Sequence, residues 1–325
     1  GYRQAHGKRS KKVSTVQIPK QKTKPKKHKR LPINKSQTVE TEENKEISDA
    51  TIDTNRSPVK DMSFIKGEGL LTAITRDGEL KVAFFVKDMP PLIQTISFSN
   101  SDINRIAVTR EDGILVYFSE TKRKLIGCAR LSTTEENGEM TADLTGYCFE
   151  NAFKNSIQTL IAAPENRYLI SLTDKQLIRV FKDGIDFEYL NPTKTFECAV
   201  VDSNFSKLFV GGMGKVEVFS LPELDLLSSI KTDSTVISID YSPSTNSIVC
   251  ALSHGAIWMI SDAGNVVHKW EAIGIRTIRA SPSHPYLAFI SQKSNMSIIS
   301  MDEGDKLYNL EEAHHDEIQE MAWSG

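Results

Sequence analysis

Residues 236–243, Val-Ile-Ser-Ile-Asp-Tyr-Ser-Pro, contain the pattern that decides the fold of this chain. Two apolar residues stand three positions apart, at Val236 and Ile239, and an aromatic residue follows at Tyr241. The pair Ser242-Pro243 then ends the segment in a turn. Apolar positions that recur over so short a run and end in a turn former predict a short, partly buried β-strand.

The same pattern recurs along the 325-residue chain. We find it seven times, beginning at Val59, Ile93, Ile157, Cys198, Val236, Ile275 and Ile318. The successive starts are separated by 34, 64, 41, 38, 39 and 43 residues. A period of about 40 residues is typical of a propeller array, in which each unit buries its apolar side against its neighbours.

Each unit also repeats the same order of short segments. After the first turn comes a second apolar strand, such as Ser247–Leu252, and then a tight turn, such as His254-Gly255. A third strand with alternating side chains follows, as in Val216–Phe219, and a more polar fourth strand, such as Leu226–Ile230, ends the unit. Four short strands at even spacing predict one propeller blade, so the expected fold class is all-β.

These units resemble WD40 repeats, and the resemblance covers residues 59–325. In the last unit His314 stands where the family has its Gly-His pair. The family's Trp-Asp pair, which ends the third strand of each repeat, falls on Phe118-Ser119, Phe181-Lys182, Phe219-Ser220, Ile260-Ser261 and Met301-Asp302. The resemblance implies a WD40-like β-propeller in which repeat positions have structural roles. The residues that we assign to such roles are Phe98, Phe118, Phe181, Phe219, Tyr241, His314 and Trp323.

We expect six complete four-stranded blades and the opening strand of a seventh. Either the polypeptide continues past Gly325, which we favour, or the domain closes in an unusual way. The start at Ile157 lies 64 residues after Ile93, which is short of two repeats. We therefore expect an insertion at residues 132–156, with an exposed acidic loop at 133–139. A long loop on a rigid scaffold can be a docking site, and it can equally be a tolerated insertion.

Residues 1–58 differ from the rest in composition. The first 39 residues contain 13 Lys or Arg and no acid, whereas the rest contains 27 basic and 42 acidic residues, a net charge of −15. Because residues 1–58 have few apolar side chains to bury, we expect a disordered basic arm that ends in an acidic linker.

The basic residues of the arm indicate nuclear import, contact with phosphate, or both. They form two clusters: Lys8, Arg9, Lys11, Lys12, Lys24, Lys26, Lys27, Lys29 and Arg30. Their spacing resembles a bipartite nuclear localisation signal. A flexible polycation can also bind RNA or another phosphate polyanion, here through residues 1–35. Since Tyr2 is the one aromatic residue of the arm, backbone contacts are expected and base stacking is not. A purely solubilising tail is the remaining alternative.

The sequence contains no motif for catalysis, cofactor binding or metal binding. The glycine-rich run Gly211–Gly214 lies between two expected strands and precedes no helix, so we do not expect a phosphate-binding loop. The four cysteines are far apart and are expected to be reduced thiols. Asp61, Asp202 and Asp240 stand at equivalent places after the first apolar pair of their repeats, so they are expected to have structural roles. The longest apolar runs are too short to span a membrane.

The sequence therefore predicts a protein-interaction scaffold and not an enzyme. Our first hypothesis is a nuclear multiprotein or ribonucleoprotein assembly, most specifically ribosome biogenesis and pre-rRNA processing, located in the nucleus and nucleolus. The arm would then contact RNA or partner proteins. A chromatin- or histone-associated subunit is the second hypothesis, because an acidic body can contact basic histones. A cytoplasmic adaptor in ubiquitin ligation or trafficking is the third. Nothing in the sequence implies a homo-oligomer.

Overall fold

The computed structural model describes part of the chain, and within that part all regular structure is β. The described residues are 59–65, 70–84, 92–97, 103–111, 113–122, 124–133, 140–149, 156–163, 169–173, 178–182, 185–190, 196–292, 294–304, 306–310, 318 and 321–323. They include 24 strands in six antiparallel sheets of four, and none of them is helical. The basic arm lies outside the described residues, so its expected import and phosphate contacts remain predictions.

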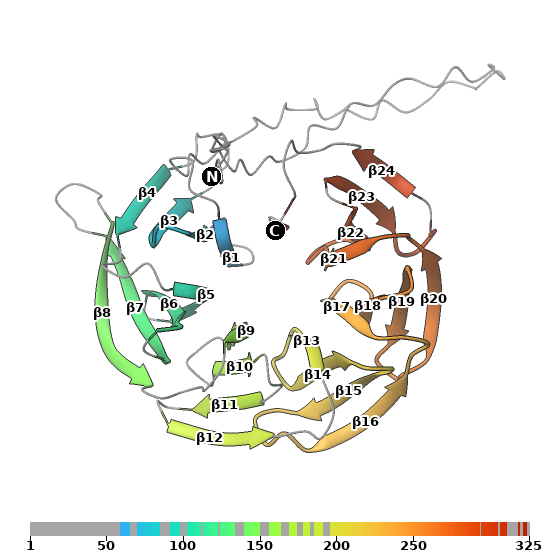
Figure 1. The fold of residues 1–325 in the computed structure, drawn as a ribbon, viewed down its shortest axis with the longest axis horizontal. Coiled ribbons are helices and arrows are strands. Elements are labelled where there is room, and N and C mark those ends of the chain that lie inside the picture. Colours follow the sequence, from blue (N-terminus) through green and yellow to red (C-terminus); the bar gives the residue numbers. More distant parts are fainter. Residues whose placement is uncertain are drawn as a thin grey trace, which may run out of the picture.

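The six sheets are arranged around a central axis as the blades of a propeller (Figure 1). In every sheet the strands are hydrogen-bonded in chain order. Blade 1 contains β1 (Val59–Ile65), β2 (Leu70–Thr75), β3 (Glu79–Phe84) and β4 (Leu92–Ser97). Blade 2 contains β5 (Ile103–Glu111), β6 (Gly113–Glu120), β7 (Leu125–Thr133) and β8 (Met140–Phe149). Blade 3 contains β9 (Ile157–Ala162), β10 (Leu169–Thr173), β11 (Ile178–Lys182) and β12 (Ile185–Leu190).

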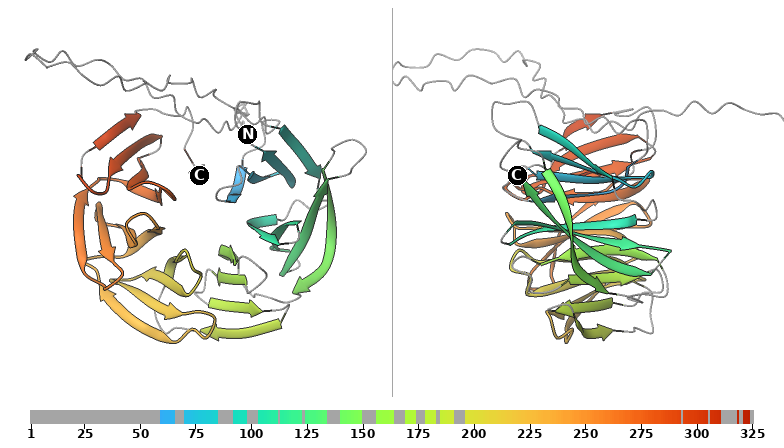
Figure 2. Two further views of the ribbon diagram at one scale, coloured as in Figure 1. Left: turned by 180° about the vertical axis from the view of Figure 1, so that it is seen from behind. Right: turned by 90° about the vertical axis from the view of Figure 1, so that its left-hand side faces the viewer.

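The other three blades have the same organisation. Blade 4 contains β13 (Phe196–Val201), β14 (Lys207–Gly212), β15 (Lys215–Ser220) and β16 (Leu226–Lys231). Blade 5 contains β17 (Val236–Ser242), β18 (Ser247–Leu252), β19 (Ala256–Ser261) and β20 (Val266–Glu271). Blade 6 contains β21 (Ile275–Ala280), β22 (Tyr286–Ser291), β23 (Asn295–Ser300) and β24 (Lys306–Leu310). The first strand of each blade lies nearest the axis and the fourth lies at the rim, as both views down the axis show (Figures 1 and 2).

Apolar side chains fill the space between consecutive blades. Between blades 4 and 5, Phe209 and Val218 pack against Val236, Ile239 and Trp258, and all five are at most 6% exposed. Clusters of this kind join every consecutive pair from blades 1 and 2 to blades 5 and 6. Burying one such side chain contributes about 1.5–3 kcal/mol. The recurring apolar residues thus face the preceding blade, which confirms the predicted propeller of four-stranded units.

The second repeat was placed wrongly by the sequence pattern. Ile93 lies in β4, the outer strand of blade 1, and blade 2 begins at Ile103. Ile106 follows Ile103 with the same three-residue spacing and is also buried. An outer strand can show the same apolar spacing as an inner one, so the pattern alone did not distinguish the two. The true starts at Val59, Ile103 and Ile157 are 44 and 54 residues apart. Phe98, which followed from the misplaced repeat, lies outside the described residues.

The expected insertion at residues 132–156 differs from what the structure shows. Its central part, Met140–Phe149, is β8, which pairs with β7 from Thr133↔Met140 to Ile126↔Phe149. The extra length of blade 2 therefore lies largely in longer strands: β5 and β7 have nine residues each and β8 has ten. Residues 134–139, which contain most of the expected acidic loop, lie outside the described part.

Phe118 has a structural role, but on a different strand from the one expected. It lies in β6, the second strand of blade 2, where we had placed it at the end of the third. Its ring is 7% exposed and belongs to the cluster between blades 1 and 2. Phe181 and Phe219 do lie in third strands, β11 and β15, as predicted.

The segment that was expected to open a seventh blade lies against blade 6. Residues 321–323 have no regular structure, and the indole Nε1 of Trp323 donates a hydrogen bond to the backbone carbonyl of Arg279 in β21 at 2.8 Å. His314 lies outside the described residues. The described part of the chain contains no helix with the length and hydrophobicity that crossing a membrane requires.

Candidate functional site

A β-bulge interrupts every inner strand one residue after its start. In β17, Val236 pairs with Leu252 and Ser238 with Ala251, so Ile237 is an extra residue without a cross-strand partner. The same register shift occurs in all six inner strands. The bulge residues are Lys60, Asn104, Gln158, Glu197, Ile237 and Arg276. Since a bulge redirects a side chain, the six blades present unlike side chains at one equivalent position along the inner wall.

The bulges also correct the start of blade 4. Phe196 is the residue before the bulge in β13, and it is 2% exposed. Cys198, which the sequence pattern took as the start, is the residue after the bulge. It is therefore equivalent to Asp61 and Ser238, and it faces blade 5 instead of blade 3.

Hydrogen bonds from side chains link several inner strands to the inner strand of the next blade. Two bulge residues donate to the carbonyl of the first residue of the following inner strand: Lys60 Nζ to Ile103 at 2.9 Å, and Asn104 Nδ2 to Ile157 at 3.0 Å. In blade 1 the residue after the bulge accepts from the next inner strand. Asp61 Oδ2 accepts from the amide of Ile106 at 2.8 Å. Such links satisfy backbone groups that no neighbouring strand of the same sheet can reach.

The three aspartates that were predicted to be structural are so, but they occupy three different positions. Asp61 follows its bulge, and Asp240 lies two residues further along its strand. Asp202 lies beyond the end of β13 and stabilises the turn to β14. Its Oδ1 accepts from the amides of Ser206 and Lys207 at 2.7 and 3.0 Å. Asp202 is 8% exposed, so its carboxylate serves the hydrogen bonds of this turn.

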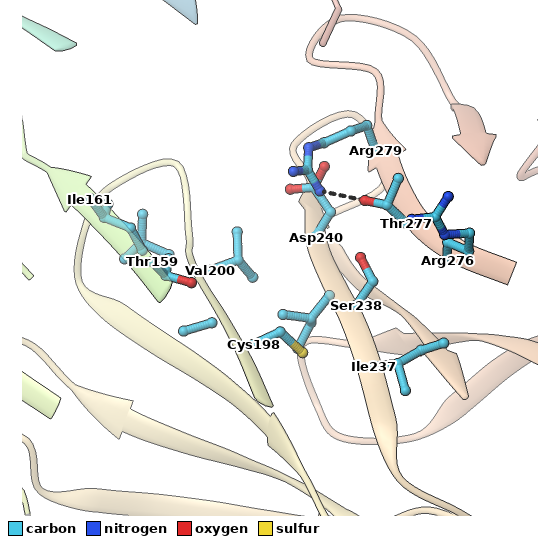
Figure 3. A pocket seen from close by; sticks show the side chains of 13 residues that line it. Thr159, Ile161, Cys198, Val200, Ile237, Ser238, Asp240, Arg276, Thr277 and Arg279 are labelled. Atoms are coloured by element: carbon cyan, nitrogen blue, oxygen red, sulfur yellow. Dashed lines mark hydrogen bonds between the residues drawn. The ribbon is translucent and has the colours of Figure 1, made fainter. Parts of the chain in front are cut away.

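A cavity of about 290 Å³ opens on the inner wall across blades 3 to 6 (Figure 3). It is lined by β9, β13, β17 and β21. Small polar side chains that follow the bulges form one level of this wall: Thr159, Cys198, Ser238 and Thr277. Asp240 and Arg279 form the next level, and Figure 3 shows the guanidinium of Arg279 pointing toward the carboxylate of Asp240. Arg279 Nη1 also donates to Thr277 Oγ1 at 3.3 Å and to the carbonyl of Ile278 at 2.8 Å.

The cavity offers polar and apolar contacts but no set of reacting groups among its described lining residues. Burial, and then the nearby Cys250 and Glu197, raise the pKa of the Cys198 thiol far above its usual range. The thiol is therefore protonated at neutral pH, where a nucleophile would need to be a thiolate. Within the described residues, no three His, Cys, Asp or Glu side chains are grouped so as to hold a metal ion.

None of the predicted repeat residues whose side chains are described is among the residues that line this cavity. The rings of Tyr241 and Phe209 are stacked 5.9 Å apart, and Phe219 meets Phe196 edge to face at 6.4 Å. Phe118 packs at another blade junction, and Trp323 contacts β21. The side chain of Phe181 is outside the described part. The sequence pattern missed the lining residues Arg276 and Arg279, because each repeat carries a different side chain at those positions.

Comparison with known proteins shows the fold. No family model matches this chain, and no curated protein is similar to it in sequence. Among solved structures, it is similar to Sqt1 of Chaetomium thermophilum, solved bound to the N-terminus of the ribosomal protein L10. The TM-score is 0.61 at 13% sequence identity, over 82% of this chain and 77% of that one. The two chains share the β-propeller fold, so the predicted fold is confirmed.

Proposed function

We propose that this chain is a non-enzymatic scaffold that binds protein segments within a nuclear ribosome-assembly complex. The observation that carries this proposal is the likeness of its fold, over 82% of the chain, to a propeller that was solved with a segment of a ribosomal protein. The acidic remainder of the chain adds support, because a net charge of −15 over residues 40–325 is complementary to basic protein segments.

The architecture suits binding better than chemistry. Clusters of buried apolar residues join the blades, and side-chain hydrogen bonds link the inner strands, so the surfaces are held in place before a partner arrives. A preorganised surface avoids part of the entropic cost of association. The proposed role of the basic arm is to direct import of the protein into the nucleus and to bind the phosphates of pre-ribosomal RNA.

Sedimentation and microscopy of the full chain test this proposal. A tagged chain is expected to accumulate in the nucleolus and to sediment with pre-ribosomal particles in sucrose gradients. Changing Lys24, Lys26, Lys27, Lys29 and Arg30 to Gln is expected to reduce nuclear accumulation while the propeller remains folded. A chain that stays in the cytoplasm and sediments only as a free protein would contradict the proposal.

The proposed contact with RNA has its own measurement. Binding of the full chain to a single-stranded RNA is expected to weaken steeply between low and physiological salt, because each neutralised phosphate releases a counterion. The variant with all nine clustered Lys and Arg residues of the arm changed to Gln is expected to lose this salt dependence. If wild type and variant bind equally, the arm is not the contact.

A further inference from the structure

The outer strands of four consecutive blades share a second β-bulge. In β16, Val218 pairs with Ser228 and Phe219 with Leu226, so Leu227 is an extra residue. The equivalent shift occurs in β12, β20 and β24. The bulge residues are Phe187, Leu227, Val267 and Leu307. They recur every 40 residues, and all four are apolar.

In β16 and β20, where side chains are described, the bulge residue and the apolar residue before it do not belong to the cores between blades. Leu226 and Leu227 are 57% and 54% exposed, and Val266 and Val267 are 39% and 48% exposed. None of the four belongs to a cluster between blades. Apolar residues that recur in propeller repeats are usually buried, whereas these recurring apolar side chains are exposed on the surface. We call Leu226, Leu227, Val266 and Val267 the outer row.

The outer row continues from blade to blade. Ile230, near the end of β16, lies against Gly264 in the turn that precedes β20, within 3.6 Å of the Cβ position there. Trp270, near the end of β20, lies against Gly304 in the turn that precedes β24 in the same way, at 3.1 Å. Figure 1 shows β16, β20 and β24 following one another around the rim. A single extended ligand can therefore contact more than one blade.

Acidic residues stand beside the outer row at each turn that leads into an outer strand. They are exposed and belong to three blades: Glu223, Asp225, Asp262, Asp302 and Glu303. Asp262 pairs with Lys207 at 2.7 Å. At the other ends of the same strands the charges are balanced, as in the pairs Lys215–Glu217 and Lys269–Asp233. The surface beside the outer row is therefore distinctly negative.

We propose that the outer row and its acidic turns bind an extended segment of a partner protein in which basic and apolar side chains alternate. β16 is the last strand of its sheet, so its outer edge has backbone groups to which a further strand can be added. It carries no charge from Leu226 to Ile230, so the exposed leucines select apolar side chains. The acidic turns select cationic ones, and the same charges repel RNA. This inference rests on the proposed scaffold function and names its partner chemistry.

The first test uses the full chain and a synthetic peptide. A fluorescein-labelled peptide of alternating Lys and Val is compared by anisotropy with a peptide of alternating Lys and Ser of equal length and charge. The Lys-Val peptide is expected to bind at least about tenfold more tightly, because it can bury the outer row. Equal binding of the two peptides would overturn the proposal, since charge alone would then explain it.

Two sets of variants place the contact on the rim. Changing Leu226, Leu227, Val266 and Val267 to Ser is expected to lower affinity for the Lys-Val peptide about tenfold. The matched control changes Met213 and Ile273 to Ser. These are exposed by 66% and 84% and lie at the opposite ends of the same blades, so no change is expected. All the substituted residues are exposed, and thermal melts confirm that both variants fold. Equal losses in the two variants would overturn the proposal.

Other occupants of the outer row give different results. If changing the nine clustered basic residues of the arm to Gln raised affinity for the peptide more than about tenfold, the arm would be the occupant and the proposal would be wrong. If the chain dimerised in sedimentation and the four-Ser variant did not, a second copy would be the occupant. Failure of the gradient experiment above with a positive peptide result would refute the ribosomal role alone. The reverse outcome would refute the outer row alone.

Discussion

The carboxylate of Asp240 in β17 accepts a hydrogen bond from the backbone amide of Ala280 in β21, across the junction between blades 5 and 6, at 2.8 Å. Ser238 accepts from the amide of Ile278 at 3.2 Å across the same junction. Consecutive inner strands are thus joined through side chains and not by a continuous backbone ladder. This leaves the inner wall partly polar along its length.

Removing the Asp240 carboxylate is expected to destabilise the ring. In Asp240→Ala the amide of the buried Ala280 loses its acceptor, and the expected loss in the free energy of unfolding is about 2 kcal/mol. Urea denaturation followed by tryptophan fluorescence measures this loss. The two carboxylate oxygens accept from the amides of Ala280 and Tyr241, so Asp240→Asn keeps one of the two acceptors and is expected to lose about half as much. An Ala variant as stable as wild type would show that these hydrogen bonds do not stabilise the ring.

The contact of Trp323 with β21 is expected to hold the C-terminal segment on blade 6. Trp323→Phe keeps an aromatic ring but removes the Nε1 donor, so the carbonyl of Arg279 loses its partner. The expected cost is about 1 kcal/mol. Hydrogen exchange of the peptide that contains Met321 is expected to become faster, while exchange in β18 is unchanged. Uniformly faster exchange across both would contradict a local role.

Some features of this fold could be predicted from the sequence because they depend on burial. Val236 and Ile239 are apolar in the pattern since each faces the preceding blade, and the same holds for Ile275 and Ile278. The start of blade 2 was missed because Ile93 and Ile96 in an outer strand have the same spacing as an inner pair. The residue pattern of a single strand does not show which strands it pairs with, and this pairing is what distinguishes an inner strand from an outer one.

The bulges explain the rest of what was missed. A bulge is a property of two paired strands, so nothing in the pattern of β13 alone placed its start at Phe196 instead of Cys198. The residues of the inner wall are chemically unlike, as Glu197 and Arg276 show, and they leave no repeat signal. The outer row does repeat, but an apolar residue in a predicted strand is read as core until its exposure is known.

Gly127 is expected to be required for the core between blades 1 and 2. It pairs with Phe118 across β6 and β7, and a Cβ atom at Gly127 would lie 2.4 Å from the Cζ of that ring. The Gly127→Ala substitution therefore forces the ring to move, at an expected cost of about 1–3 kcal/mol. Thermal unfolding measures the change. The double variant with Phe118→Leu is expected to lose less than the sum of the two single variants. Additive losses would show that the two residues do not interact.

The stability of the propeller is expected to fall as the pH rises above 9. Burial raises the pKa of Cys250 from 9.0 to about 12, and burial also raises the pKa values of Cys198 and Tyr241. A group whose pKa is higher in the folded state keeps its proton while the unfolded chain loses it. As the pH rises above the pKa that the group has in the unfolded chain, the free energy of unfolding therefore decreases. The decrease is complete once the pH exceeds the pKa of the group in the folded protein. Urea midpoints at pH 8, 9, 10 and 11 measure the slope. Cys250→Ala is expected to be less stable than wild type at pH 8, with a flatter decline up to pH 11. An unchanged slope would mean that the thiol is not responsible.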